Sequence, residues 1–217
     1  MRKKWISLIL LFTGSIFNTL AQQPSIRNFT TNIYGGGTQN WCVSQSDDKR
    51  MLFANNNGLL SYDSEKWATY NIANNTIVRS IYYDKKHDCI YAGASNEFGY
   101  YFLDSITYQP TYRSLSDKLP QNERSFDEVW NIYKYNNAIA FQCKKHIFLL
   151  KPSGKFKIFH TKYRIESSAV INDKIIITCK ETIYYILNNQ LHIMNNTNVL
   201  RGKSIRAIIP YLNGKII

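Results

Sequence analysis

The sequence predicts an all-β fold built from repeated units of four short antiparallel strands. Aromatic residues make up 14% of the 217-residue chain, and together with β-branched residues they suit half-buried strands. Short apolar runs alternate with turns rich in Asn and Gly, which tolerate the positive φ of tight hairpins. The same pattern of four strands returns about every 40 residues. These three observations predict a repeat architecture.

The repeat is clearest in the second half of the chain. Hairpins over residues 129–143 and 167–179 turn at Asn136-Asn137 and at Asn172-Asp173, and each ends its second strand on a cysteine. A third strand is expected at 144–148 and at 180–184, and a fourth at 155–160 and at 190–195. The two segments therefore superpose strand for strand.

Two earlier units follow the same pattern. The first has predicted strands at 41–45, 51–54, 59–63 and 67–70, and the second at 78–83, 90–94, 98–103 and 108–113. A polar insertion around residues 120–124 separates them from the later units. A fifth unit begins with a strand at 205–212, turns at Asn213-Gly214 and stops inside its second strand at Ile217.

Four short strands in about 40 residues is the period of a β-propeller blade. One blade cannot bury both of its faces, whereas stacked neighbours bury them and shield the strand edges. A β-sandwich also has short, regular strands, but it needs no internal repeat. We therefore expect an incomplete β-propeller over residues 38–217, after a lead-in segment at 22–37. Its blades are expected at 38–73, 74–118, 126–162 and 163–202, with a truncated fifth at 203–217 and a chain cut short at its C-terminus.

The N-terminus has the pattern of a secretory signal peptide. Arg2-Lys3-Lys4 precedes an apolar stretch over residues 5–17, and Ala21 offers a small residue at the cleavage position. The alternative is an uncleaved anchor, but the stretch is shorter than the ~20 residues that a membrane span needs. We expect residues 1–21 to be removed and the remaining chain to be exported to the periplasm.

The charge, the cysteines and the histidines bear on which partners and cofactors we expect. The formal net charge is +12, but the lysines are scattered and no basic helix or aromatic RNA-binding pattern is present, so nucleic acid is not an expected partner. The four cysteines lie apart in apolar runs without a Cys-x-x-Cys pair. Export permits disulfides, yet buried free thiols are the favoured interpretation. The four histidines show no ligand spacing, and we expect neither a metal nor any other cofactor.

Residues 57–63 read Asn-Gly-Leu-Leu-Ser-Tyr-Asp, and an aromatic residue, Trp67, opens the next strand. This segment resembles the repeat of the two-component-regulator propellers, and Asn96 to Tyr101 is similar to it. The specific motifs extend only from about Gly35 to Tyr101, since the later blades lack the Gly-Leu signature.

The resemblance implies the extracytoplasmic part of a signalling regulator that often responds to glycan fragments. In that family an immunoglobulin-like domain, a membrane span and an intracellular kinase or helix-turn-helix output follow the propeller. None of these parts is in this sequence, so membrane anchoring and dimerisation through missing domains are implications of the resemblance alone.

Two groups of residues are candidates for ligand binding. Glu97, with Asn96 and nearby aromatic rings, has the chemistry to hold a sugar, and Asn57 lies in the corresponding turn of the first blade. The plain alternatives are a solvated acid, a cap within the blade and turn-forming asparagines. Trp41, Arg79 and Trp130 fall near the first strand of three successive blades, where side chains can face the central channel. An arginine flanked by aromatic rings suits an anionic sugar, and packing between blades is the competing interpretation.

The sequence favours a sensing module that binds a glycan fragment or a partner protein. A propeller enzyme acting on polysaccharide would need paired carboxylates or a metal cluster near the axis, and the sequence offers isolated acids without an expected catalytic residue. A scaffold propeller without a small ligand is the third hypothesis.

Overall fold

The structure of the chain is a computed structural model, and it describes residues 25–103, 110–180, 182–195, 197, 203–205 and 207–209. The expected signal peptide lies outside these residues. The contacts separate residues 1–30 from a second compact unit that contains residues 31–217.

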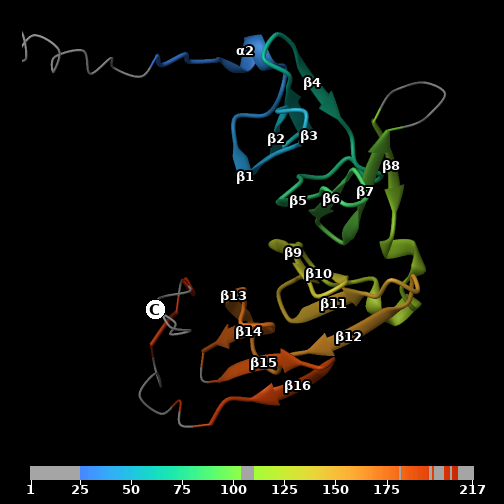
Figure 1. Cartoon of the computed structure of the whole chain (residues 1–217), viewed down its shortest axis with the longest axis vertical. Coiled ribbons are helices and arrows are strands. Elements are labelled where there is room, and N and C mark those ends of the chain that lie inside the picture. Colours follow the sequence, from blue (N-terminus) through green and yellow to red (C-terminus); the bar gives the residue numbers. More distant parts are fainter. Residues whose placement is uncertain are drawn as a thin grey trace, which may run out of the picture. The chain divides into compact units, whose positions relative to one another are not determined.

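The described residues of the second unit form four separate antiparallel sheets of four strands each (Figure 1). Their strands are, blade by blade, β1 Asn40–Gln45, β2 Met51–Asn55, β3 Gly58–Tyr62 and β4 Trp67–Tyr70; β5 Ser80–Asp84, β6 Cys89–Ala94, β7 Glu97–Leu103 and β8 Pro110–Ser114; β9 Asn131–Tyr135, β10 Ala138–Gln142, β11 His146–Leu150 and β12 Phe156–His160; β13 Ile165–Ile171, β14 Lys174–Cys179, β15 Ile183–Leu187 and β16 Gln190–Ile193. Each sheet is a simple meander, because its strands are hydrogen-bonded in chain order.

The hairpin turns use the residues that the sequence analysis singled out. Asn136 has a φ of 54°, and Asn172 and Asp173 have φ of 48° and 57°. Short polar side chains tolerate this left-handed region better than others, so the turns hold the strands in register. The third strands of blades three and four start later than predicted. Their first expected residues form the turn instead, closed in blade three by a bond from the Cys143 N–H to the His146 carbonyl, 2.8 Å.

The core lies between the sheets. The first strands β1, β5, β9 and β13 neighbour one another in that order. Three apolar clusters join blades one and two, two and three, and three and four, with Leu59, Phe98 and Ile177 as fully buried members of the three. Burying one such side chain contributes about 1.5–3 kcal/mol, so the faces between blades supply most of the stability.

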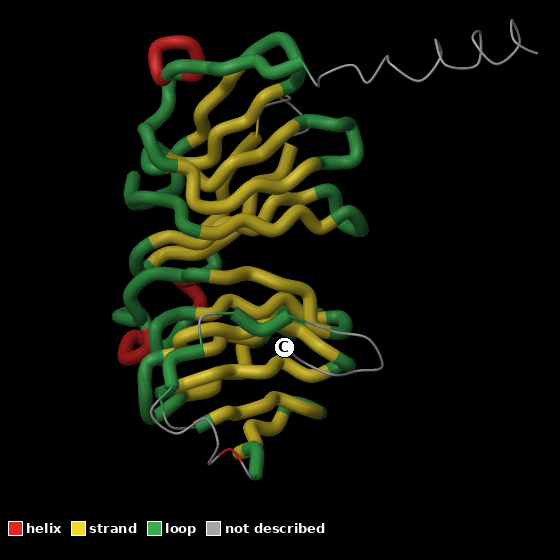
Figure 2. Tube along the Cα trace, turned by 90° about the vertical axis from the view of Figure 1, so that its left-hand side faces the viewer, coloured by secondary structure: helices red, strands yellow, loops and turns green. Residues whose placement is uncertain are grey.

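Helices are minor in this unit (Figure 2). The α-helix α2, Thr31–Tyr34, precedes blade one, and two 3-10 turns, η1 Ser116–Lys118 and η2 Gln121–Glu123, lie in the polar insertion between blades two and three. Leu119 and Phe126 anchor this insertion in the core that blades two and three share. No helix among the described residues is long and apolar enough to cross a membrane.

The predicted first strand of a fifth blade is not seen in the described residues 203–205 and 207–209, which carry no strand. The backbone N–H of Ile205 donates to the Glu166 carboxylate, 3.0 Å, rather than to a neighbouring strand. The remaining residues of that prediction, 206 and 210–217, lie outside the described part.

Candidate functional site

Each blade has one residue at an equivalent position near the start of its first strand, which gives four such residues in all. Ser80, Asn131 and Ser167 pair with equivalent residues of the second strand, as Cys42 does in blade one. The residue immediately before each of them is Trp41, Arg79, Trp130 and Glu166, in blade order. We call these four residues the inner row. The first three were predicted from the sequence, whereas Glu166 was not, because blade four lacks an aromatic or basic residue at that position.

Bulges place two members of the inner row. The pairing of β1 with β2 shifts register between Asn40 and Cys42, and that of β13 with β14 shifts between Ile165 and Ser167. Trp41 and Glu166 are therefore the extra residues. A bulge re-aims the side chain of the unpaired residue, which is a common arrangement beside binding sites.

Arg79 joins blades one, two and three. Its guanidinium carbon lies 3.9 Å from the centre of the Trp41 ring and 5.3 Å from that of Trp130. The two indole rings meet edge to face, with centroids 6.4 Å apart. Such cation–π contacts contribute about 0.5–2 kcal/mol, depending on how dry the site is. The predicted cluster of Trp41, Arg79 and Trp130 thus forms in space.

The Arg79 charge is partly balanced. Nε and Nη2 donate to Glu128 Oε1 at 3.2 and 2.8 Å, while the buried Nη1 has no hydrogen-bond partner among the described residues. The side chains of Arg79 and Glu128 are 13% and 31% exposed. The guanidinium therefore combines an ion pair to Glu128 with contacts to two indole rings, and one of its donor atoms is left for a further acceptor if the cluster opens.

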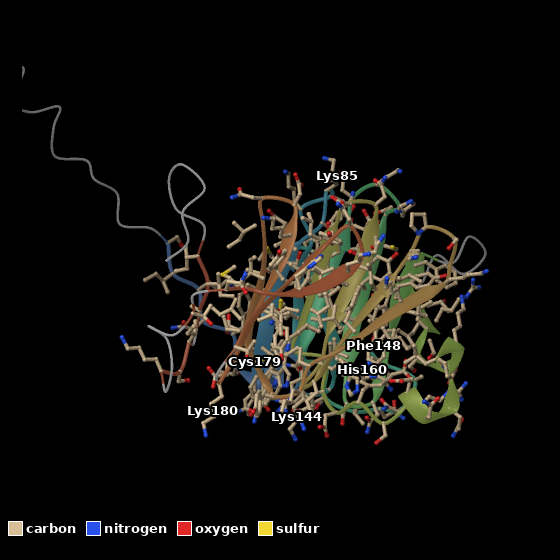
Figure 3. The ribbon with its side chains drawn as sticks, turned by 90° about the horizontal axis from the view of Figure 1, so that it is seen from below. Lys85, Lys144, Phe148, His160, Cys179 and Lys180 are labelled. Carbon is tan, nitrogen blue, oxygen red and sulfur yellow. The ribbon has the colours of Figure 1, made fainter. Side chains whose placement is uncertain are left out.

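Trp41 is the most exposed part of the cluster, with 42% of its surface accessible. Its indole N–H donates to Asn56 Oδ1, 2.8 Å, which fixes the ring against the turn between β2 and β3. Turns of this kind lie at one end of the blades. Figure 3 shows Lys144 and Lys180, from the corresponding turns of blades three and four, at this end, and Lys85 at the opposite end.

A polar network lines the first strands of blades three and four. Gln142 Oε1 accepts hydrogen bonds from Asn131 Nδ2, 2.6 Å, and from Ser168 Oγ, 3.2 Å. Tyr133 donates to the same serine at 3.2 Å. The network therefore places hydroxyl and amide groups next to the inner row, since Asn131 directly follows Trp130.

The other predicted candidates have internal partners. Glu97 is 6% exposed and accepts hydrogen bonds from Tyr112, Ser114 and Ser116 at 2.8–2.9 Å, so it acts as a cap within blade two. Burial first, and the Glu97 carboxylate second, raise the pKa of Tyr112 far above its usual value, which keeps the phenol a hydrogen-bond donor.

The two asparagines hold turns. Asn96 Oδ1 accepts from the backbone of Phe126 and Asp127, at 2.8 and 2.9 Å, and Asn57 is an exposed turn residue whose N–H bonds Asn55 Oδ1. Neither of them joins the inner row.

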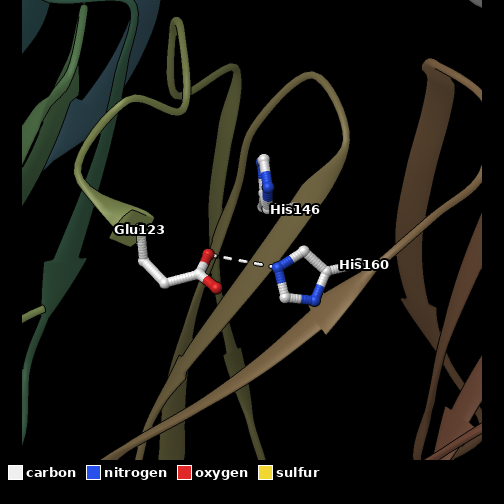
Figure 4. A group of neighbouring side chains, drawn as sticks. All are labelled: Glu123, His146 and His160. Atoms are coloured by element: carbon white, nitrogen blue, oxygen red, sulfur yellow. Dashed lines mark hydrogen bonds and ion pairs between the residues drawn. The ribbon is translucent and has the colours of Figure 1, made fainter. Parts of the chain in front are cut away.

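A second polar group was not anticipated from the sequence. Glu123, His146 and His160, which are far apart in the chain, converge in blade three (Figure 4). Their spacing shows no ligand motif because strand pairing and the insertion, rather than a local turn, bring them together.

The comparisons with known proteins concern the fold. No protein-family model and no curated protein matches the chain. Solved structures do match. The WD40 propeller domain of Doa1 aligns with 80% of the chain at 14% identity and a TM-score of 0.58. The described residues form part of a β-propeller.

Two bacterial structures share this propeller fold. The extracellular domain of a putative hybrid two-component system from B. thetaiotaomicron covers 92% of the chain at 16% identity, with a TM-score of 0.62. A catalytically inactive virginiamycin B lyase from Staphylococcus aureus covers 83% at 15% identity, with a TM-score of 0.60. The chain spans 60% of the Doa1 domain, 69% of the lyase and 28% of the extracellular domain of the two-component system. The predicted propeller is confirmed, and sensors and enzymes both use it.

Proposed function

We propose that this propeller is the exported sensing part of a signalling protein and that it binds a glycan fragment at the inner row. The observation that carries the proposal is the Trp41–Arg79–Trp130 cluster, in which a half-exposed indole and an incompletely paired guanidinium lie together. Aromatic faces pack against the C–H faces of sugars, and charged side chains bind their hydroxyl or carboxylate groups.

The acids near the inner row support binding rather than catalysis. Glu128 forms an ion pair with Arg79, and Glu166, itself a member of the inner row, accepts the backbone N–H of Ile205. A glycosidase needs one carboxylate to donate a proton and a second to act as nucleophile or base. The similarity to an extracellular domain of a two-component system, over 92% of the chain, supports the sensing role.

The binding part of the proposal is tested by titrating the chain with an acidic oligogalacturonide and with a neutral cello-oligosaccharide, followed by calorimetry. We expect saturable binding of at least one of them. Trp41→Ala and Arg79→Met should each weaken it by about tenfold or more, as the loss of roughly 1.4 kcal/mol implies. Matched controls are Trp67→Phe on β4 and Arg113→Met on β8, which lie outside the inner row.

The sensing part is tested in the cell. Deleting the gene should abolish the transcriptional response to the glycan that binds, and a gene carrying Trp41→Ala should fail to restore it. A response that survives deletion, or binding that is insensitive to both inner-row variants, contradicts the proposal.

A further inference from the structure

Three side chains with metal-binding atoms converge in blade three, away from the inner row. His146 begins β11 and His160 ends β12, and the two are directly paired across the strands, with ring centroids 4.9 Å apart. Glu123, the last residue of η2, places Oε2 3.1 Å from His160 Nε2 (Figure 4). One donor atom from each residue lies within 4.8 Å of the other two.

The donor set suits zinc. Zn²⁺ binds imidazole nitrogen and carboxylate oxygen at about 2.0–2.2 Å, whereas Mg²⁺ and Ca²⁺ prefer oxygen ligands alone. Donors around a tetrahedral zinc lie about 3.4 Å apart, so donor atoms that are up to 4.8 Å apart here must approach by up to about 1.4 Å. The side chain of His160 is 53% exposed and has room to rotate.

His146 is positioned by the core and has an unused buried atom. Its ring stacks on Phe148, with centroids 5.7 Å apart and planes 13° from parallel, and Phe148 is fully buried. The Nδ1 atom of His146 is buried, and no residue in the described part of the chain hydrogen-bonds it.

Glu123 is held in place by the insertion that carries it. The next residue, Arg124, donates from Nε to the Leu119 carbonyl, 3.0 Å, and from Nη2 to the Asp117 carbonyl. Leu119 is itself 2% exposed, and the Glu123 side chain is only 16% exposed. The carboxylate is therefore presented to the histidines by a packed segment rather than by a loose loop.

We propose that Glu123, His146 and His160 bind one Zn²⁺ ion, a site that we call the zinc clip. The ion links the insertion between blades two and three to the β11–β12 hairpin. Three protein ligands leave a fourth position that water fills. Because the ligands come from two segments that are separate in sequence, metal binding stabilises the folded arrangement of both.

The test uses the untagged chain, stripped with a chelator and then titrated with Zn²⁺ alone against a chromophoric competitor. We expect one zinc per chain and a rise in the melting temperature on zinc addition. H160A and E123Q should each weaken zinc binding by more than about tenfold, the size that even the loss of an outer-shell partner produces. Co²⁺ should give visible absorption bands that H160A abolishes.

The matched control is H192A. His192 lies on β16, the fourth strand of the next blade, as His160 lies on the fourth strand of blade three, but it stacks on Tyr185 away from the clip. It should bind zinc as the unaltered chain does. Circular dichroism checks that H160A and E123Q fold. We expect both to fold, because the His160 side chain is 53% exposed and Glu123 lies in the insertion outside the sheets. Absence of saturable zinc binding, or equal affinity in H160A, E123Q and H192A, overturns the proposal.

Discussion

At the scale of single residues, the buried carboxylate of Glu97 shows how a candidate ligand group becomes a structural one. Three hydroxyl groups donate to it inside blade two, from Tyr112, Ser114 and Ser116. The sequence places Glu97 beside aromatic residues, but the partners come from β8 and from η1, which sequence proximity does not reveal. An acid that already has three donors has little left to offer a ligand.

Glu97→Ala should therefore destabilise the chain. It leaves buried hydroxyl groups without an acceptor and removes charge-assisted hydrogen bonds, so we expect a loss of about 3 kcal/mol in the free energy of unfolding, measured by urea titration. Glu65→Gln, at an exposed turn, should change it by less than about 0.5 kcal/mol. Equal effects of the two variants would show that the Glu97 network contributes nothing.

The cysteines give a second prediction at this scale. All four are free thiols; Cys89, Cys143 and Cys179 are buried and Cys42 is half-buried. Burial raises the pKa of Cys89 and of Cys179 to about 11, and that of Cys143 well above its usual range. A raised pKa means less thiolate, so at pH 8 only about one buried thiol in a thousand is ionised.

Iodoacetamide at pH 8 should therefore label Cys42 first, and the other three cysteines only after urea is added. Peptide mass spectrometry reads the order directly. Rapid labelling of Cys143 in the folded chain, or a peptide that links Cys143 to Cys179, would contradict this arrangement of the blades.

At the scale of strands and turns, the sequence predicted most of the architecture because its signals are local. Hairpins with Asn at positive φ, alternating apolar residues and a period of about 40 residues all depend on neighbours in the chain. Strand ends were less predictable, since backbone bonds such as Cys143 N–H to His146 decide where a turn stops. The inner row was partly predictable because it recurs with the repeat, whereas Glu123, His146 and His160 meet only through tertiary packing.

Gly58 gives a prediction for the β2–β3 turn. Its φ is 122°, and a Cβ there would collide with the carbonyl oxygen of Tyr70 on the adjacent strand β4. Gly58→Ala should cost more than about 2 kcal/mol, because backbone strain and steric overlap add. Gly154, with a φ of 76° but nothing near its Cβ, is the matched control, and its alanine variant should cost only about 1 kcal/mol. Urea unfolding of both variants separates the cost of steric overlap from that of backbone strain. Similar losses of unfolding free energy in the two variants would mean that β3 and β4 move apart easily.

At the scale of the whole molecule, stacking leaves the blades in unequal environments. Strand β5, with neighbours on both sides, is largely buried, whereas β1, the equivalent strand of blade one, has mostly exposed or half-buried residues. Val43 on β1 is 59% exposed and Val170 on β13 is 36% exposed. In a propeller such faces normally pack against another blade, so these surfaces are suited to apolar contact.

We therefore expect residues 22–217, prepared alone, to associate through the exposed face of blade one. Sedimentation velocity at increasing protein concentration should show oligomers. Val43→Asp should shift the population to monomer, because a carboxylate at the centre of an apolar contact loses its hydration. Thr111→Asp adds the same charge on the outer strand β8 and should leave association unchanged. A monomer at every concentration would show that the β1 face is covered within the chain itself, and equal effects of the two variants would show that net charge, rather than this face, controls association.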